Sequence, residues 1–220
     1  MANIMPFIDG LWTGGDLPAG EEIASPQERT YLANISQVTD RIWTGGDLPD
    51  NDAARQHILD WEAAGIGVIV DNRLEWNDEA LVAAFRPGIR YLHNGVDDAG
   101  GRQPDCWFDA AVDFAQRALD ETGTGVLLHC HMGINRGPSA AYAVLLAEGW
   151  NPVDAIDLIR ARRPIAAVGY AEDALDWWHR RTCANATRRA HETTGLATWR
   201  DANPHDTVRI IRAIRAGEAA

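Results

Sequence analysis

The sequence contains no lysine, only three cysteines and no long apolar run. All 20 basic side chains are arginine, against 32 acidic ones, and the net charge is −12. A protein that follows a nucleic-acid backbone usually presents a basic face, so this composition does not favour a nucleic-acid partner. No segment approaches the ~20 consecutive apolar residues of a membrane-spanning helix. The lack of lysine beside abundant alanine indicates a GC-rich bacterial genome.

The cysteines are Cys106, Cys130 and Cys183. They are too few and too scattered for a disulfide framework. No Cys-x-x-Cys pair is present, so we expect no cysteine zinc site, no other metal and no cofactor. The first ten residues lack the basic region and the apolar run of a signal peptide. We therefore expect a cytoplasmic protein, in which an isolated cysteine is either a buried apolar residue or a reactive thiolate.

Short apolar segments alternate with segments of helical periodicity between residues 36 and 182. Strands are predicted at residues 41–44, 66–70, 89–93 and 125–129, and helices at 50–64, 77–85, 104–119, 138–147, 152–163 and 171–181. This alternation predicts an α/β domain with a central, mostly parallel sheet flanked by helices. The adjacent Trp177 and Trp178 are expected to pack against the core or the C-terminal tail.

Two terminal segments flank this predicted domain. Residues 1–35 form an N-terminal extension in which Leu11–Pro18 nearly repeats Ile42–Pro49 around the shared Trp-Thr-Gly-Gly-Asp. Each copy is predicted to be a short strand that ends in a Gly-Gly turn. The first copy is either an extra edge strand or a segment that replaces the second copy or covers the site. Residues 183–220 form a C-terminal tail with a helix over 207–215, whose apolar stripe is Val208, Ile211 and Ile214.

The segment His129–Ser139 carries the clearest chemistry. A buried strand delivers Cys130 into a short loop, and an apolar helix follows. Backbone N–H groups of such a loop converge on an anion, and the helix N-terminus adds positive potential. The same field favours the thiolate form of Cys130. Arg136 is able to hold two phosphate oxygens, and Gly133 permits a backbone conformation that side chains disfavour. These features predict phosphoryl transfer through a phosphocysteine.

This segment resembles the His-Cys-x-x-Gly-x-x-Arg signature of the protein tyrosine phosphatase superfamily, with His129, Cys130, Gly133 and Arg136 at its defining positions. The resemblance implies a cysteine phosphatase-like fold, with Cys130 as nucleophile and Arg136 as phosphate clamp. It implies that His129 orients the loop. The phosphate-binding loop would comprise His131, Met132, Gly133, Ile134, Asn135 and Arg136.

The order and spacing of residues from Asp98 to Cys130 are similar to those of a dual-specificity phosphatase. The resemblance implies a general acid on a mobile loop about thirty residues before the cysteine. Asp98 lies 32 residues before Cys130 and fits this register better than Asp97. Its physical task is to protonate the leaving oxygen as the P–O bond breaks. Gly100 and Gly101 follow it and would let the loop close over substrate.

The sequence departs from the family pattern directly after the signature arginine. Family members usually carry Ser or Thr there, whose hydroxyl assists departure of the thiolate. Gly137 occupies the position, and Ser139 follows two residues later as either a substitute hydroxyl or a helix-cap residue. We therefore expect slow hydrolysis of the phosphoenzyme, and a Gly137→Ser change is expected to raise turnover.

The favoured hypothesis is a phosphatase that acts on a phosphoprotein or a small phosphomonoester. We expect a shallow pocket, which accepts phosphotyrosine and also phosphoserine or phosphothreonine. The alternatives are a phospho-binding pseudophosphatase with slow turnover and an RNA or nucleotide 5′-phosphatase. A rhodanese-like sulfur transferase fits the spacing less well. Arg73 follows a predicted strand, and it is interpreted either as a solvated loop residue or as a second anion contact.

Overall fold

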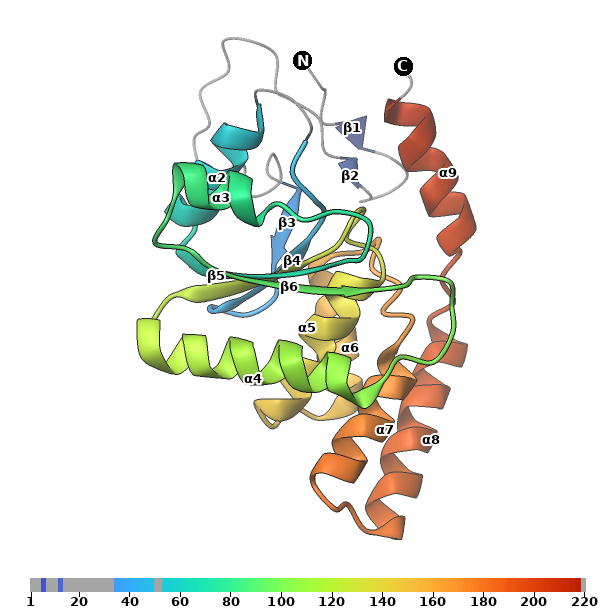
Figure 1. Cartoon of the computed structure of the whole chain (residues 1–220). Coiled ribbons are helices and arrows are strands. Elements are labelled where there is room, and N and C mark those ends of the chain that lie inside the picture. The colour runs from blue at the N-terminus through green and yellow to red at the C-terminus, as the bar shows by residue number, and fades with distance from the viewer. Residues whose placement is uncertain (1–4, 7–11, 14–33, 50–52, 219–220) are drawn as a thin grey trace.

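The computed structural model describes residues 5–6, 12–13, 34–49 and 53–218 (Figure 1). Its main element is a five-stranded sheet of β3 (Ile35–Gln37), β4 (Ile42–Gly45), β7 (Gly125–His129), β5 (Ile66–Arg73) and β6 (Arg90–Val96). The strand order is β3-β4-β7-β5-β6, and only β3 runs antiparallel to its neighbour. The predicted mostly parallel sheet is confirmed, and β7 lies at its centre.

Both faces of the sheet are covered, because side chains of successive strand residues point to opposite sides. Val68, Val70 and Leu128 join the larger core, whereas Ile69 and Leu127 join a second core on the other face. The larger core lies under α4 (Asp105–Thr122) and α5 (Arg136–Ala147), with α6 (Pro152–Arg162) and α7 (Ala171–Arg181) packed around α5. On the opposite face lie α2 (Ala53–Ala63) and α3 (Glu79–Phe85) (Figure 1).

Local sequence signals explain several element ends. The Asn151 side chain accepts a hydrogen bond from the Val153 amide at 2.9 Å, and Pro152 begins α6, as expected for a capped helix start. Gly65, with φ of +86°, turns the chain from α2 into β5. α5 begins at Arg136, two residues before the expected start, so the signature arginine occupies the first helical turn.

The C-terminal segment holds two helices, of which the sequence predicted one. The unpredicted α8 (Ala186–Ala202) places Leu196 and Trp199 in the larger core. Trp177 is also buried there, as expected. The predicted stripe of α9 (Thr207–Glu218) is wrong in one position: Val208 is 58% exposed, and Ile210 is the buried residue. Ile210, Ile211 and Ile214 form the apolar face of α9.

The structure describes the second copy of the N-terminal repeat but only part of the first. The second copy contains β4, as predicted, and continues toward the signature loop. Of the first copy, only β2 (Trp12–Thr13) is described, paired with β1 (Met5–Pro6), and the rest lies outside the described residues. Hypotheses about its role therefore stay untested. Among the described helices, none combines the length and apolar character needed to cross a bilayer.

Candidate active site

The signature loop joins β7, the central strand, to α5, and its carbonyl groups face outward. The backbone carbonyl oxygens of residues 131 to 135 each accept a hydrogen bond. Those of His131, Ile134 and Asn135 accept from the amides of Asp47 at 2.9 Å, Ala167 at 2.7 Å and Ser139 at 2.9 Å, respectively. Those of Met132 and Gly133 accept from Arg163, from its Nη2 atom at 3.0 Å and from its Nε atom at 2.6 Å. In a trans peptide the N–H points opposite to the C=O. The N–H groups of residues 132–136 are therefore directed to the inner side of the turn.

Arg163, at the end of α6, holds the back of this loop. Its side chain is buried, and besides the carbonyls of Met132 and Gly133 it contacts Asn34 Oδ1 at 3.0 Å. Among the described residues it has no carboxylate partner. Burial lowers the pKa of Arg163 to about 10, and the negative charge of Cys130 opposes that shift. Arg163 thus places a positive charge behind Cys130. Arg163 was not identified from the sequence.

The second copy of the repeat supports the same loop from β4. Cys130 is buried, and its amide donates to the Gly45 carbonyl at 3.2 Å. Gly133 has φ of +64°, and a Cβ there would lie 2.4 Å from the Gly45 carbonyl carbon. The expectation that Gly133 adopts a backbone conformation that side chains disfavour is confirmed. The Asp47 carboxylate contacts His131 Nδ1 at 2.6 Å, on the exposed side of the loop.

Arg136 lies at the mouth of the loop and is held by Glu75. Its Nη1 and Nη2 atoms each donate to one Glu75 carboxylate oxygen at 2.7 Å. Burial would lower the pKa of Arg136, but its hydrogen bonds to Glu75 and the charges of Cys130 and Asp98 outweigh burial and raise it. The same hydrogen bonds lower the pKa of Glu75 to about 2, although its side chain is 52% exposed. Glu75 was not predicted from sequence.

Asp98 lies beside this pair. One of its oxygens accepts from Asn135 Nδ2 at 2.6 Å and from Tyr170 Oη at 2.7 Å, and the other is 3.4 Å from Arg136 Nε. Asn135 also accepts from the Gly169 amide at 2.6 Å, so it fixes the position of Asp98 relative to the loop. Burial, then the bond to Asp98, raises the pKa of Tyr170 to about 12, which keeps it a donor.

A cavity of about 420 Å³ opens at this point, lined by Leu74, Glu75, Asp97, Asp98, Ala99 and Arg136. Asp97 lies on its wall, but its carboxylate has none of the contacts of Asp98. The structure thus brings Asp98 to the signature loop, in the register expected from sequence. The cavity holds the Arg136 guanidinium and the Asp98 carboxylate, and the signature loop ends at Arg136. A guanidinium and a carboxylate at the end of a loop of inward amides suit a phosphate monoester.

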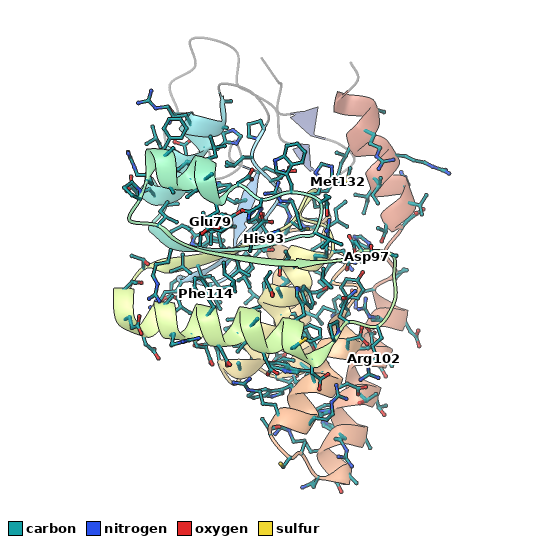
Figure 2. The ribbon with its side chains drawn as sticks, in the orientation of Figure 1. Glu79, His93, Asp97, Arg102, Phe114 and Met132 are labelled. Atoms are coloured by element: carbon teal, nitrogen blue, oxygen red, sulfur yellow. The ribbon has the colours of Figure 1, made fainter. Side chains whose placement is uncertain are left out.

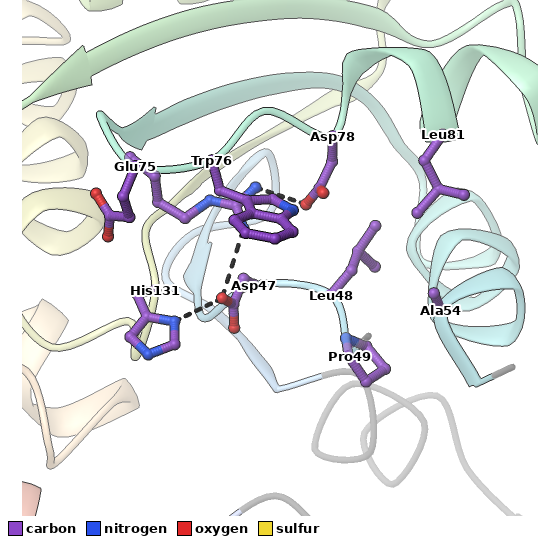
Figure 3. Close-up of a pocket in the computed structure, with 10 residues that line it drawn as sticks. Asp47, Leu48, Pro49, Ala54, Glu75, Trp76, Asp78, Leu81 and His131 are labelled. Atoms are coloured by element: carbon purple, nitrogen blue, oxygen red, sulfur yellow. Dashed lines mark hydrogen bonds and ion pairs between the residues drawn. The ribbon is translucent and has the colours of Figure 1, made fainter. Parts of the chain in front are cut away.

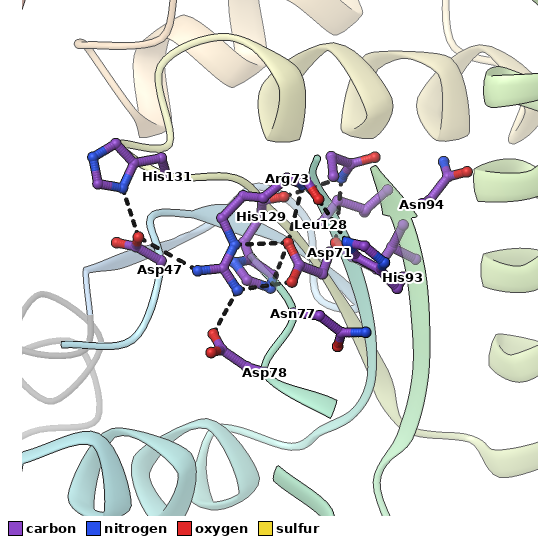
Figure 4. Close-up of polar contacts among 12 residues, drawn as sticks. Asp47, Asp71, Arg73, Asn77, Asp78, His93, Asn94, Leu128, His129 and His131 are labelled. Atoms are coloured by element: carbon purple, nitrogen blue, oxygen red, sulfur yellow. Dashed lines mark hydrogen bonds and ion pairs between the residues drawn. The ribbon is translucent and has the colours of Figure 1, made fainter. Parts of the chain in front are cut away.

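His129 and Arg73 belong to a buried polar network beneath the loop (Figure 4). His129 Nε2 lies 3.7 Å from Asp71, and burial lowers the pKa of His129 despite that carboxylate. Arg73 is 2% exposed and contacts Asp71, Asp78 and Asp47 at 2.7, 2.5 and 3.4 Å. Neither interpretation of Arg73 as a solvated residue or an anion contact is right, because three carboxylates surround it.

Ser139 and Gly137 anchor α5 to its surroundings. The Ser139 hydroxyl is buried and accepts from the Tyr170 amide at 3.2 Å, so Ser139 joins α5 to the start of α7 and is not a helix cap. A Cβ at Gly137 would lie 2.8 Å from the Leu128 carbonyl oxygen and 3.0 Å from the His129 backbone. A serine at position 137 therefore requires α5 to move away from β7, which the sequence did not indicate.

The outer flank of the loop is covered by α9. Ile134, Ile165 and Ile210 form a small buried apolar cluster, and the partly buried Met132, Ile211 and Ile214 pack against it. Figure 2 shows Met132 beside α9, on the same side of the view as Asp97. The C-terminal helix thus packs directly against the signature loop.

No protein-family model matches the chain. Bovine dual specificity protein phosphatase 26 is 35% identical over 79 residues, and its human counterpart is 34% identical over the same length. These matches cover 36% of this chain and 37% of the length of each relative.

Solved structures match over a larger part of the chain. PTPMT1 in complex with PI(5)P has a TM-score of 0.56 and 19% identity, over 68% of this chain and 97% of that one. A mouse putative dual specificity phosphatase has a TM-score of 0.56 and 17% identity, over 74% and 94%. Tk-PTP has a TM-score of 0.55 and 17% identity, over 67% and 97%.

The chain therefore shares its α/β fold with these solved structures. In sequence, a stretch of 79 residues of the chain is similar to dual specificity protein phosphatase 26. The resemblance stated from the signature residues is confirmed at this level. The bacterial origin, the cytoplasmic location and the absence of a cofactor stay predictions.

Proposed function

We propose that the chain is a cysteine-dependent phosphatase that hydrolyses phosphotyrosine, and to a lesser degree phosphoserine and phosphothreonine, through a phosphocysteine intermediate. The observation that carries the proposal is the outward bonding of five consecutive loop carbonyls, which directs the following amides to the inner side of the turn that begins at Cys130. The cavity beside Arg136 is open to solvent and suits a monoester on an exposed side chain.

The proposed reaction has two steps. The phosphate displaces Glu75 from Arg136 and takes the inner amides. The Cys130 thiolate attacks phosphorus, the P–O bond to the leaving group breaks, and Asp98 gives its proton to the leaving oxygen. Water then attacks the phosphocysteine, Asp98 accepts a proton from that water, and the S–P bond breaks to release phosphate and the thiolate. Asn135 and Tyr170 hold Asp98 in place for both transfers.

The rim of the site distinguishes between the candidate substrates. Glu75, Asp97 and Asp98 line the cavity, and Arg136 is the only basic residue that lines it among the described residues. A polyanionic 5′ triphosphate would meet repulsion at such a rim. The acidic rim therefore favours a single phosphate group over an RNA or nucleotide end. The pseudophosphatase alternative rests on Gly137, and it predicts binding with little turnover.

The test is turnover of p-nitrophenyl phosphate and a phosphopeptide panel by the full chain. Cys130→Ser is expected to abolish turnover. Asp98→Asn is expected to lower kcat on phosphopeptides by about 10²–10³-fold. Asp97→Asn is the matched control, and its kcat is expected to stay within about threefold, because Asp97 lacks the contacts of Asp98. Equal effects of the two asparagine variants would contradict the assignment of Asp98.

A further inference from the structure

A second cavity, of about 800 Å³, lies next to the signature loop (Figure 3). Its walls come from the chain after β4, from the start of α2, from the end of β5 and the loop before α3, from α3 itself and from the signature loop. They include Leu48, Trp76, Leu81 and His131. Glu75 lines this cavity and also the smaller one that holds Arg136 and Asp98. One carboxylate therefore stands at the boundary between the proposed catalytic pocket and a larger neighbouring space.

Glu75 cannot keep its partner when phosphate binds. In the structure it occupies both Nη atoms of Arg136 at 2.7 Å each. A phosphate that binds Arg136 bidentately needs the same donors. Glu75 is then left as a charged group without its guanidinium. Its pKa of about 2 in the resting pair shows how strongly that partner stabilises the charge.

The larger cavity offers surroundings suited to a cation. Trp76 is 63% exposed on its wall, and a tryptophan face attracts a guanidinium or ammonium group. Asp47 and Asp78 also line it, and they share Arg73 with Asp71, so three carboxylates surround one guanidinium. His131 pairs with Asp47. Release of Glu75 adds one more negative charge to this region.

We propose that the larger cavity receives a basic side chain of a phosphoprotein substrate, close in sequence to the phosphorylated residue, and that Glu75 and Trp76 bind it. The proposal rests on the proposed phosphatase function. Substrate binding exchanges one ion pair for two: the phosphate pairs with Arg136 and the substrate cation pairs with Glu75. Arginine suits the site better than lysine, because its planar guanidinium both bonds a carboxylate in two places and stacks on an indole.

The experiment uses phosphotyrosine peptides that carry arginine or the neutral isostere citrulline at each position from −3 to +3. Binding is measured to the full chain with Cys130→Ser, so that the readout does not depend on turnover. At one position or more, the arginine peptide is expected to bind about tenfold more tightly than its citrulline partner. Adding Trp76→Ala or Glu75→Gln is expected to reduce this ratio to below threefold.

Two controls separate the site from general effects. Trp150 is also exposed, at 40%, but lies between α5 and α6, so Trp150→Ala should retain the tenfold ratio. Glu75→Gln weakens the competitor of phosphate at Arg136, so the KM for p-nitrophenyl phosphate is expected to fall while the arginine preference is lost. Equal affinities for arginine and citrulline at every position would overturn the proposal even if Cys130-dependent turnover is found. Absence of turnover with a retained arginine preference would instead overturn the phosphatase function alone.

Discussion

The back of the signature loop and its rim are built from different kinds of contact. At the back, buried Arg163 and backbone amides bind loop carbonyls, and none of these contacts obstructs an incoming phosphate. At the rim, half-exposed Glu75 and Asp98 bind Arg136 through charged atoms that a phosphate also requires. The back is therefore a permanent scaffold, whereas the rim is an arrangement that substrate binding exchanges. The predictions below test this difference, beginning with the largest expected effect.

Arg163→Met breaks the back of the loop. The carbonyls of Met132 and Gly133 lose their donor, and each unsatisfied buried group costs about 1–3 kcal/mol. We expect turnover of p-nitrophenyl phosphate to fall by about 10²-fold or more, since misplaced catalytic geometry has effects of this size. Unfolding in urea should show lower stability. Neighbouring Arg162 is exposed, so Arg162→Met should change neither quantity. Full activity of Arg163→Met would contradict the scaffold.

Gly137→Ser tests how tightly the back of the loop is packed. The added Cβ would lie 2.8 Å from the Leu128 carbonyl oxygen. Because that oxygen belongs to the backbone, it cannot move aside as a flexible side chain can. We expect a loss of about 1–3 kcal/mol in the free energy of unfolding, as in overpacked cores. The higher turnover expected from the family pattern would then be masked by the displaced helix. Thermal unfolding measures the loss of stability. Unchanged stability together with faster turnover would contradict the prediction, because it would show that α5 accommodates the serine without cost.

The cover provided by α9 is expected to have a smaller effect. Ile210→Asp places a charge in the apolar cluster with Ile134 and should detach α9 from the loop. We expect kcat/KM for p-nitrophenyl phosphate to fall by about three- to tenfold, because the loop retains Arg163 but loses its apolar cover. Exposed Val208 provides the control, and Val208→Asp should behave as wild type. Equal behaviour of both variants would mean that α9 does not support the loop.

The smallest expected effect concerns pH and His129. Burial lowers the pKa of His129, so the native chain keeps it neutral where the unfolded chain binds a proton. Stability should therefore fall as pH decreases below about 6.5, with a slope of at most ~1.4 kcal/mol per pH unit from this group. Urea unfolding of His129→Gln between pH 7 and 5.5 should show a shallower slope. A slope in His129→Gln that equals the wild-type slope would contradict the assignment.

Sequence patterns predicted the elements that local spacing determines. The buried strand before Cys130, the helix after it and the glycine at 133 are all present as expected. Asp98 lies where its spacing from Cys130 suggested. These features depend on short segments whose periodicity and turn residues are visible in the chain itself.

Contacts between distant segments were not predictable in the same way. Glu75 reaches Arg136 across 61 residues and Arg163 reaches Asn34 across 129. No spacing rule connects such residues in a single sequence. Arg73 looked solvated because its three carboxylate partners are revealed only by the fold. The stripe on α9 was misplaced because several apolar positions were available, and only packing on Ile134 and Ile165 selects Ile210.

The most direct test of the account is to trap the covalent intermediate. The full chain is mixed with a phosphotyrosine peptide, quenched with acid within milliseconds to seconds, and analysed by mass spectrometry of its fragments. The account predicts one added phosphoryl group on Cys130, which accumulates because Gly137 provides no hydroxyl for its hydrolysis, and which is absent from Cys130→Ser. Sustained turnover without any phosphoryl group on Cys130, or with one on another residue, would contradict it.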